Sequence, residues 1–454
     1  METFRSTYER RLTALDVKQN IPFTVQVPPG TTSLRIHLDF TPSVVERIRN
    51  LLTLTVFDPA GWRGESHRGG SHQAISLGPG EVSPGYLAGP VQPGEWTVFV
   101  NTHMVRTGSP CQMRLTVYGV DDPVEAARPA PPSGHTAPRG PGWYRGDLHA
   151  HTRHSDARWD VPDLVADARR RKLDFATLSD HNTIAGLPEM DAARSDDLLT
   201  MGGMELTTFW GHALVLGLRD YTDWRTLPGQ RSMPETAADV TRRGGLFIIA
   251  HPKSVGDPLC TGCDWRFDGL MPGQARVVEV WNNDWFSESN SEDNLHLAYE
   301  WLNQGHRLAL TAGSDNHGGH LKRTALAFNV VQADELSEPA ILRAVSQGRL
   351  YLSAGPELRL DSAAGDQSAG LGDSILPEPG QPIRLRAEWT GAPAGSRLAL
   401  VLDGQPRDAF TPAAHGTHDW EIPSGEAHWG LLTLRDAGGK MLALTNPIFW
   451  DGRA

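Results

Sequence analysis

The pair His149 and His151, in the segment GDLHAHTRHSD, is an arrangement that could do chemistry. Residues two apart on a β-strand project from the same face, so both imidazoles can point toward one ligand. Asp156 follows five residues later, in the expected loop. Similar side chains recur in LSDHN, GMELTT, WGHALVLG, IIAHP and AGSDNH, namely His181, Glu205, His212, His251, Asp315 and His317. Together these residues offer nitrogen and oxygen ligands and no thiolate.

Most of these side chains fall at or just beyond the carboxyl end of an expected strand. Strand patterns such as FATLSDH, LFIIAHP, VVEVWNN and LALTAGSD alternate with helix patterns such as VPDLVADARRRK, ETAADVTRRGG, NLHLAYEWLNQG and EPAILRAVSQG. This alternation predicts a mainly parallel sheet, open or closed as a barrel, whose active site lies at the carboxyl ends of the strands. His212 instead begins its strand, which predicts one antiparallel step.

Six histidines and three carboxylates at equivalent points of one sheet need partners, because buried charges and imidazoles are costly to leave unpaired. Divalent cations satisfy them together, so we expect a metal cluster. Nitrogen and oxygen ligands suit Zn²⁺, Mn²⁺ or Fe²⁺. Closely spaced cations lower the pKa of a bridging water, and the expected nucleophile is a metal-bound hydroxide. Such a site hydrolyses phosphate esters, and also carbamates or carboxyl esters where the pocket is apolar.

The motifs DLHAHTRHSD, SDHN, MEL, AHP and SDNH, in this order, resemble those of the PHP family, named for polymerase-associated and histidinol phosphatase domains. The resemblance covers Tyr144 to about Ser353, and VEVWNND and ALTNPIFW are more similar to its carbaryl-hydrolase-like branch. It implies an irregular seven-stranded β/α barrel that binds two or three divalent ions. The implied ligand sets are His149, His151, Glu205 and Asp315 for one ion, Glu205, His212 and His251 for a second, and Asp156, His181 and His317 for a third.

The first motif departs from the family at one position. The family often has glycine after the motif aspartate, whereas this chain has Ala157. The departure leaves His154 as an alternative to Asp156 in the third site.

Two β-rich regions flank this central region. Alternating strands such as LRIHLDF, EWTVFVN and PIRLRAEW, with frequent turn residues between them, indicate antiparallel sandwiches. The expected organisation is an N-terminal β-sandwich (1–121), a Pro/Ala/Gly-rich linker (122–142), the α/β barrel (143–355) and a C-terminal β-sandwich (356–454). The sandwiches are expected to cap the barrel or to pair subunits. In the second case the protein would be a homo-oligomer.

Further residues near the motifs have two possible roles each, one functional and one structural. Asp180, beside His181, either orients a ligand or shuttles a proton, or it makes an ordinary strand-end hydrogen bond. Lys253 and Arg323 could contact a substrate phosphate, Arg in a bidentate manner, or be plain surface charges.

The strand VVEVWNN carries three more candidates. Trp281 could wall a substrate pocket, as could Trp210 and Trp285, although a Trp near a strand is more often packed in the core. Asn282 is expected to face the site and to contact substrate. Glu279 is a candidate to orient a ligand from behind.

Cys260 and Cys263, in PLCTGCDW, form a single CxxC. A closed zinc site would need two further ligands, and the surroundings of a thioredoxin-like motif are missing from this sequence. We therefore expect the pair to shape a loop close to the metal site, with sensitivity to redox conditions left open.

The composition excludes several classes of protein. The chain has 454 residues with 42 basic and 54 acidic side chains, a formal charge of −12, and this acidic balance argues against a nucleic-acid polymer as partner. No apolar run approaches a membrane span and the N-terminus lacks the pattern of a signal peptide, so no membrane association and a cytoplasmic location are expected. Three cysteines agree with a reducing compartment. Nucleophile-elbow, Walker and dinucleotide motifs are missing, which excludes serine-nucleophile and nucleotide-driven chemistry.

The leading hypothesis is a metal-dependent hydrolase that acts on a small-molecule phosphomonoester or phosphodiester. A carbamate or carboxyl ester hydrolase using the same metal site is the second hypothesis. A catalytically idle binding protein is the third, and the complete set of ligand residues argues against it.

Overall fold

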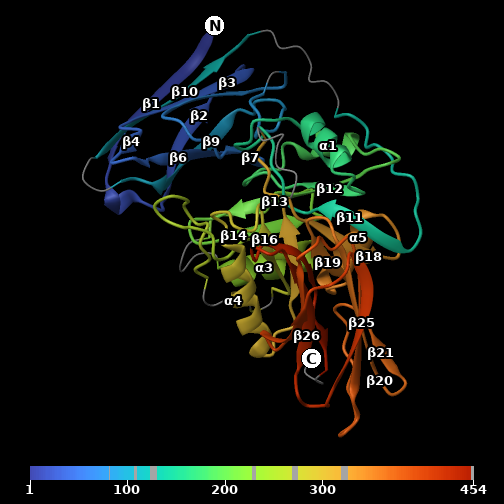
Figure 1. The fold of residues 1–454 in the computed structure, drawn as a ribbon. Coiled ribbons are helices and arrows are strands. Elements are labelled where there is room, and N and C mark those ends of the chain that lie inside the picture. Colours follow the sequence, from blue (N-terminus) through green and yellow to red (C-terminus); the bar gives the residue numbers. More distant parts are fainter. Residues whose placement is uncertain are drawn as a thin grey trace.

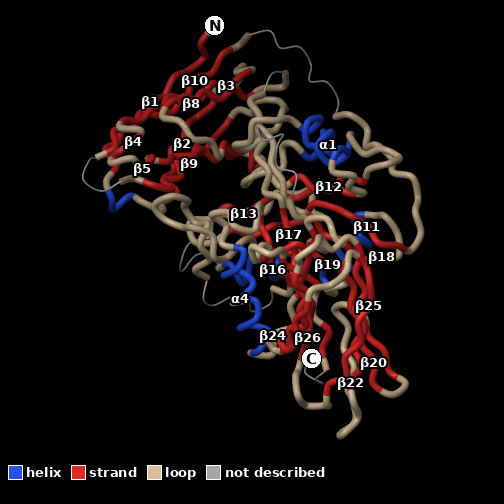
Figure 2. Tube along the Cα trace, in the orientation of Figure 1, coloured by secondary structure: helices blue, strands red, loops and turns tan. Residues whose placement is uncertain are grey.

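The structure is a computed structural model that describes residues 1–80, 82–106, 110–122, 130–226, 232–267, 273, 275–318 and 326–450. Strands make up much more of it than helices (Figure 2). The N-terminal part lies at one end of the molecule, and the C-terminal strands lie at the other (Figure 1). No helix in the described ranges is both long and apolar enough to cross a membrane.

The N-terminal part is built from two four-stranded antiparallel sheets, in the orders β1-β10-β3-β8 and β2-β9-β6-β7. In β10 the residues Cys111, Met113, Leu115 and Val117 alternate with more exposed ones and enter the core between the sheets. The strands are β1 (Glu2–Leu12), β2 (Asn20–Val27), β3 (Ser33–Thr41), β6 (Leu51–Asp58), β7 (Gly61–Ser66), β8 (His72–Leu77), β9 (Gly94–Met104) and β10 (Cys111–Val120), with a short 3₁₀ turn (Ala14–Asp16) and a small hairpin of β4 (Val44–Val45) and β5 (Ile48–Arg49).

The central part contains seven strands in sequential order, β17-β16-β15-β14-β13-β12-β11. The pairs on either side of β14 are antiparallel and the other pairs are parallel, so the antiparallel step predicted at His212 is confirmed. The strands are β11 (Gly142–Asp147), β12 (Phe175–Leu178), β13 (Leu199–Thr207), β14 (His212–Leu216), β15 (Leu246–Ile249), β16 (Val277–Asn282) and β17 (Ala309–Gly313).

The expected closed ring of seven strands is not seen in the pairing of the described strands. β11 pairs on its other side with β18 (Phe328–Ala333), so that edge is occupied. Beyond their carboxyl ends, however, the segments after β11 and β17 meet: the His151 amide donates to the Asn316 carbonyl at 3.1 Å, and the Asp315 amide donates to the His149 carbonyl at 2.9 Å. The strand ends that carry the polar motifs are therefore brought together although the strand ladder stays open.

The helices lie where the sequence patterns predict them, with one addition. They are α1 (Val161–Arg170), α2 (Leu187–Ala192), α3 (Met233–Arg242), α4 (Ser291–Asn303) and α5 (Glu338–Ser346), of which the short α2 was not expected. Ser232 begins α3 with a capping box, in which its hydroxyl accepts from the Glu235 amide and the Glu235 carboxylate accepts from the Ser232 amide. Gly244, with φ of 85°, ends it in the left-handed conformation.

The C-terminal strands continue the central sheet. From β18 the order runs through β19, β27, β26, β23 and β24, while β21-β20-β22-β25 form a separate sheet. The alternation predicted in PIRLRAEW is confirmed by the burial of Ile383, Leu385, Ala387 and Trp389. These strands are β19 (Leu350–Ser353), β20 (Glu357–Ala364), β21 (Gln367–Ala369), β22 (Ile383–Thr390), β23 (Arg397–Leu402), β24 (Gln405–Phe410), β25 (His415–Ile422), β26 (Trp429–Arg435), β27 (Met441–Thr445) and β28 (Ile448–Phe449).

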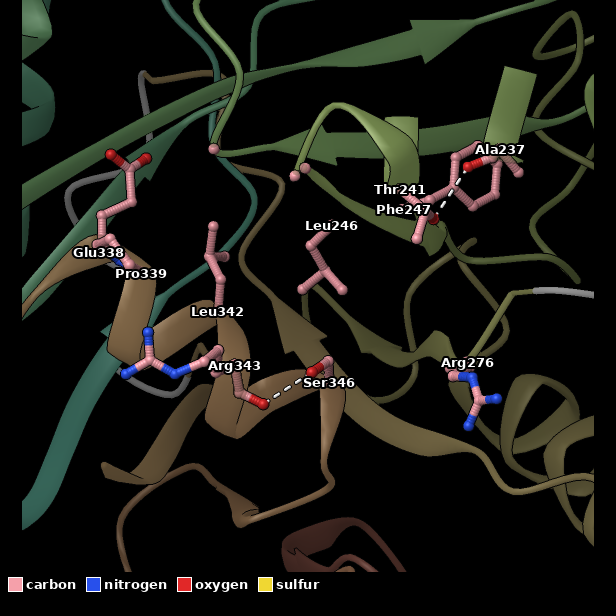
Figure 3. Close-up of a pocket in the computed structure, with 13 residues that line it drawn as sticks. Ala237, Thr241, Leu246, Phe247, Arg276, Glu338, Pro339, Leu342, Arg343 and Ser346 are labelled. Atoms are coloured by element: carbon pink, nitrogen blue, oxygen red, sulfur yellow. Dashed lines mark hydrogen bonds between the residues drawn. The ribbon is translucent and has the colours of Figure 1, made fainter. Parts of the chain in front are cut away.

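A cavity of about 530 Å³ lies between β15 and α5 (Figure 3). Leu246, Phe247, Leu342 and Arg343 contribute to its wall. Leu246 is the first residue of its strand, so this cavity is at the end of the sheet opposite the polar motifs. None of the site residues predicted from the sequence is among its described lining residues.

Candidate metal centre

Glu205, on β13, lies where several imidazoles converge. Its Oε1 is 3.1 Å from His212 Nδ1 and 3.2 Å from His251 Nε2. Its Oε2 is 2.8 Å from His181 Nδ1. The carboxylate is fully buried, so these three imidazoles come from three separate segments to a point that bulk water does not reach.

His149 and His151 face each other as their spacing predicts. Their Nε2 atoms are 3.1 Å apart. Asp315 Oδ1 is 2.9 Å from His151 Nε2 and 3.4 Å from His149 Nε2, and Glu205 Oε2 is 3.4 Å from each. Two ring nitrogens and two carboxylate oxygens are thus directed at one small volume.

Asp156 belongs to a neighbouring group with His181 and His317. Its Oδ1 is 3.2 Å from His317 Nε2 and 3.6 Å from His181 Nε2. The alternative, His154, is turned elsewhere, because its Nδ1 accepts from the Gly85 amide at 3.2 Å. The geometry therefore favours Asp156 over His154 at this position.

Among the described residues, four groups of side chains have ligand atoms within 4.8 Å of one another and could hold a metal ion. They are His151, Asp156, His181 and His317; His149, His151 and Asp315; His149, His251 and Glu279; and Glu205, His212 and His251.

The chemistry of these residues fits cations. Four deeply buried polar atoms of this site make no well-oriented hydrogen bond among the described residues, although ring nitrogens lie close to the two carboxylate oxygens: Glu205 Oε2, Asp315 Oδ1, His151 Nδ1 and His251 Nδ1. Buried polar atoms are rarely left in this state, because each costs roughly 1–3 kcal/mol. Two of them are carboxylate oxygens aimed at the ring nitrogens described above, which is the arrangement that a bound cation would satisfy.

The pKa values of the two carboxylates also fit a cation site. Burial disfavours the ionised form of Glu205, but the facing His181, His149 and His212 outweigh it and hold its pKa well below the usual value. Asp315 behaves in the same way, with His149 as the main opposing charge, so its pKa is also well below the usual value. Both groups are therefore held as anions.

Two ligand candidates sit on strained backbone. His251 has φ of 30° and Asp315 has φ of 48°, values that side-chain-bearing residues rarely adopt. Such strain costs of order 1–3 kcal/mol and is typical of functional sites.

Glu279 lies behind His149 and fixes its orientation. His149 Nδ1 lies 3.1 and 3.2 Å from the two Glu279 carboxylate oxygens, a position in which it donates to Glu279 and leaves Nε2 free to act as a ligand. Asn282 donates to Glu279 at 3.0 Å and to Asp315 Oδ2 at 3.3 Å. Its buried amide thus supports these two carboxylates, and a substrate contact by Asn282 stays a prediction.

Trp281, a candidate for the wall of a substrate pocket, lies in the hydrophobic core. It is fully buried and packs against Trp285, with ring centroids 5.1 Å apart, in the main hydrophobic core. The register of β16 shifts between Glu279 and Trp281, and this bulge breaks the alternation that would have placed both on one face. Trp210 is half-buried beneath the Lys18 ammonium, whose Nζ is 3.7 Å from its ring centroid.

Asp180 holds the loop that follows His151. It accepts from the Thr152 amide at 2.7 Å, the Thr152 hydroxyl at 2.6 Å and the Ser155 hydroxyl at 2.7 Å. Burial raises its pKa, but these three donors engage both carboxylate oxygens. Of its two readings, the geometry supports the structural one.

The loop containing Cys260 and Cys263 closes over His212. The two cysteines form a disulfide. Between them, the Thr261 carbonyl accepts from His212 Nε2 at 3.3 Å. That bond leaves Nδ1, the atom that faces Glu205, unprotonated and available as a ligand.

A polar cavity of about 320 Å³ opens beside the third group, lined by Asp156, Arg158, Asn283, Ser314, Asp315, Asn316, His317, Gly318 and Leu326. Arg158 is exposed, and its amide donates to the His317 carbonyl at 2.8 Å. The sequence reading missed Arg158, although its place two residues after Asp156 was an available signal. Lys253 is exposed and is not among the described lining residues, and Arg323 lies outside the described residues.

The N-terminal part also reaches the centre. His67, just after β7, has its ring centroid 4.8 Å from that of His181 and 5.0 Å from that of His103. Sequence reasoning missed both residues, because motif spacing carries no information about which loop of another sheet pair will lie over the strand ends.

Comparisons with known proteins gave weak structural likenesses. No family model matches the sequence, and no curated protein matches it. A two-domain protein from Bacteroides vulgatus containing a predicted PHP-like metal-dependent phosphoesterase is 16% identical over 71% of this chain and 100% of its own, with a TM-score of 0.38. A protein from Bifidobacterium adolescentis assigned as a metal-dependent phosphoesterase is 18% identical over 47% of this chain and 96% of its own, with a TM-score of 0.30. An amidohydrolase from Chromobacterium violaceum with bound sulfate is 19% identical over 38% of this chain and 87% of its own, with a TM-score of 0.27.

Proposed function

We propose that the protein is a metal-dependent hydrolase that cleaves phosphate esters, mono- or diesters. The observation that carries the proposal is the convergence of imidazoles on the buried Glu205 carboxylate, next to a polar cavity that contains Arg158. Divalent cations held there would supply an activated water and polarise the oxygen under attack. The residues of the chain hold these cations and bind the substrate.

The proposed ligand sets are those that the motif resemblance implies, and each shares three residues with one of the groups that the side chains form. Two or three ions are expected, of Zn²⁺, Mn²⁺ or Fe²⁺, since the donors are nitrogen and oxygen atoms. Glu279 and the Thr261 carbonyl fix the tautomers of His149 and His212. The ligand sets are His149, His151, Glu205 and Asp315; Glu205, His212 and His251; and Asp156, His181 and His317.

The substrate would enter through the polar cavity. Arg158 offers a planar set of donors that matches two phosphate oxygens, and Asn283 and Asn316 add polar groups to the wall. Apart from the imidazole of His317, the described residues of that wall include no aromatic ring. This favours an anionic group over an aryl carbamate.

The test is to assay metal-loaded protein on p-nitrophenyl phosphate, bis-p-nitrophenyl phosphate and 1-naphthyl N-methylcarbamate. We expect turnover of one or both phosphate esters. Turnover of the carbamate alone would support the carbamate and carboxyl ester alternative and reject the phosphoesterase. No turnover of any ester would support a binding protein.

A variant pair ties the activity to the centre. His149→Ala should abolish turnover, because it removes a buried ring nitrogen from the ligand group. His296→Ala, at an exposed histidine on α4, is the matched control and should behave as wild type. Full activity in His149→Ala would sink the metal mechanism for every ester.

A further inference from the structure

The segment after β7 is fastened to the centre on both sides of His67. Two residues before it, the buried Glu65 carboxylate accepts from Asn182 Nδ2 at 3.1 Å, and Asn182 is the neighbour of His181. One residue after it, Arg68 donates to the Ser155 carbonyl at 3.1 Å and to the Arg153 carbonyl at 2.6 Å. The segments that carry His181 and Asp156 are therefore both tied to this part of the sandwich.

A second clamp lies beside the first. The Gly85 carbonyl accepts from the Thr183 hydroxyl at 2.8 Å, and the Gly85 amide donates to His154 Nδ1. Gly85 has φ of 91°, and a Cβ built there would lie 2.3 Å from the Glu65 carbonyl oxygen and 2.5 Å from the His154 carbonyl oxygen. Only glycine allows this close approach, so the contact between sandwich and central sheet is built into the sequence.

These clamps present His67 to the metal centre. Its ring centroid lies 4.8 Å from that of His181, a member of the ligand groups. Its Nδ1 is buried and has no hydrogen-bond partner among the described residues. His181 in turn lies 3.6 Å, through its Nε2, from Oδ1 of Asp156, which lines the polar cavity, so the His67 imidazole lies behind His181 on this side of the centre.

We propose that the N-terminal sandwich supplies a substrate-binding residue, His67, to the metal centre, so that the active site is formed jointly by the sandwich and the central sheet. The imidazole donates a hydrogen bond to an oxygen of the substrate's phosphoryl group, on the side of the site next to His181. This inference rests on the proposed phosphoesterase function for the identity of the substrate, and on the geometry alone for the position of His67.

The experiment compares His67→Ala, His67→Gln and wild type, with His72→Ala as control, since His72 is an exposed histidine of the same sandwich. Three quantities are measured: binding of inorganic phosphate to metal-loaded protein by calorimetry, metal content by elemental analysis, and kcat and KM on p-nitrophenyl phosphate and bis-p-nitrophenyl phosphate. Thermal unfolding checks that each variant is folded.

We expect His67→Ala to weaken phosphate binding and to lower kcat/KM by about tenfold to a hundredfold, the usual effect of losing one hydrogen bond to a charged group. Metal content should be unchanged, and His67→Gln should recover part of the loss because its amide can still donate. His72→Ala should match wild type.

Two results would overturn the proposal. Phosphate binding and kcat/KM within twofold of wild type in both His67 variants would show that the residue does not contact substrate. A loss of bound metal in these variants would make His67 a metal ligand instead. Because phosphate binding is measured without turnover, the test decides on His67 even if wild type hydrolyses neither phosphate ester, a result that would reject the proposed function separately.

Discussion

At the scale of single residues, Glu205 and Glu279 have different roles at the metal centre. Glu205 faces the ring nitrogens of five histidines within 3.4 Å. Glu279 lies on the far side of His149, against its Nδ1, and sets which of its nitrogens is free. A change at Glu205 would therefore remove a ligand, whereas a change at Glu279 would leave the ligands present but loosen one of them.

Glu279→Gln tests this division. An amide cannot accept from His149 with both of its terminal atoms, so the imidazole loses part of its orientation. Metal affinity should fall about 10- to 100-fold, as is usual for groups that orient metal ligands. Titration of apo-protein with Zn²⁺ measures it, with Glu300→Gln, at an exposed position of α4, as the control. Unchanged affinity in Glu279→Gln would show that this contact does not matter.

Arg158→Ala tests how substrate is held. Loss of the guanidinium should raise KM for p-nitrophenyl phosphate by about tenfold or more with little change in metal content, and Arg158→Lys should restore only part because Lys cannot bind two oxygens in a plane. Steady-state kinetics measure this, with Arg384→Ala, at an exposed position of β22, as control. A KM that matches wild type would remove Arg158 from the substrate site.

At the scale of elements, the patterns that could be predicted are those with strong local periodicity. The helix pattern of EPAILRAVSQG and the alternation of PIRLRAEW specify their structures because burial of one face decides both. In the N-terminal strand β1, Phe4, Tyr8 and Leu12 are also spaced as on a helix face, and pairing with β10 makes the segment a strand. The bulge in β16 was missed, since no local signal marks it.

The contact between β7 and the central sheet can be tested at Glu65. Its carboxylate accepts from Asn182, from Trp224 Nε1 at 2.6 Å and from the Thr55 hydroxyl at 2.5 Å. Glu65→Ala leaves buried donors unpaired and should lower the free energy of unfolding by about 2–3 kcal/mol. Denaturant unfolding measures this, with Glu95→Ala on the exposed face of β9 as control. Equal stabilities would mean that these bonds contribute nothing net.

Cys111, at the start of β10, reports on the core of the sandwich. Burial raises the pKa of its thiol to about 11. Since only the thiolate reacts, roughly one molecule in a thousand is reactive at about pH 8, and the fraction increases as the pH rises toward the pKa. We expect that no thiol of the native protein reacts rapidly with Ellman's reagent. One thiol should react after unfolding, and three should react after unfolding with reduction. Rapid labelling of the native protein would place Cys111 outside the core.

At the scale of the whole molecule, the strand ends of the central sheet meet a second layer, the two N-terminal sheets. The motif residues could be found from the sequence because a parallel sheet gathers the carboxyl ends of its strands. The residues contributed by the sandwich could not, since their place depends on how two sheets far apart in the chain pack together. Glu65, His67 and Gly85 are examples. Their roles depend on the packing of the segment 153–155 and Asn182 against this part of the chain.

The most direct test of the account is the metal content of the purified protein after incubation with Zn²⁺, Mn²⁺ or Fe²⁺ and removal of free ions. We expect two or three tightly bound ions per chain in wild type, and at least one fewer in Glu205→Gln, whose side chain stands at the meeting point of two ligand sets. Less than one ion per chain in wild type, or an unchanged content in Glu205→Gln, would contradict the metal centre on which the proposed function rests.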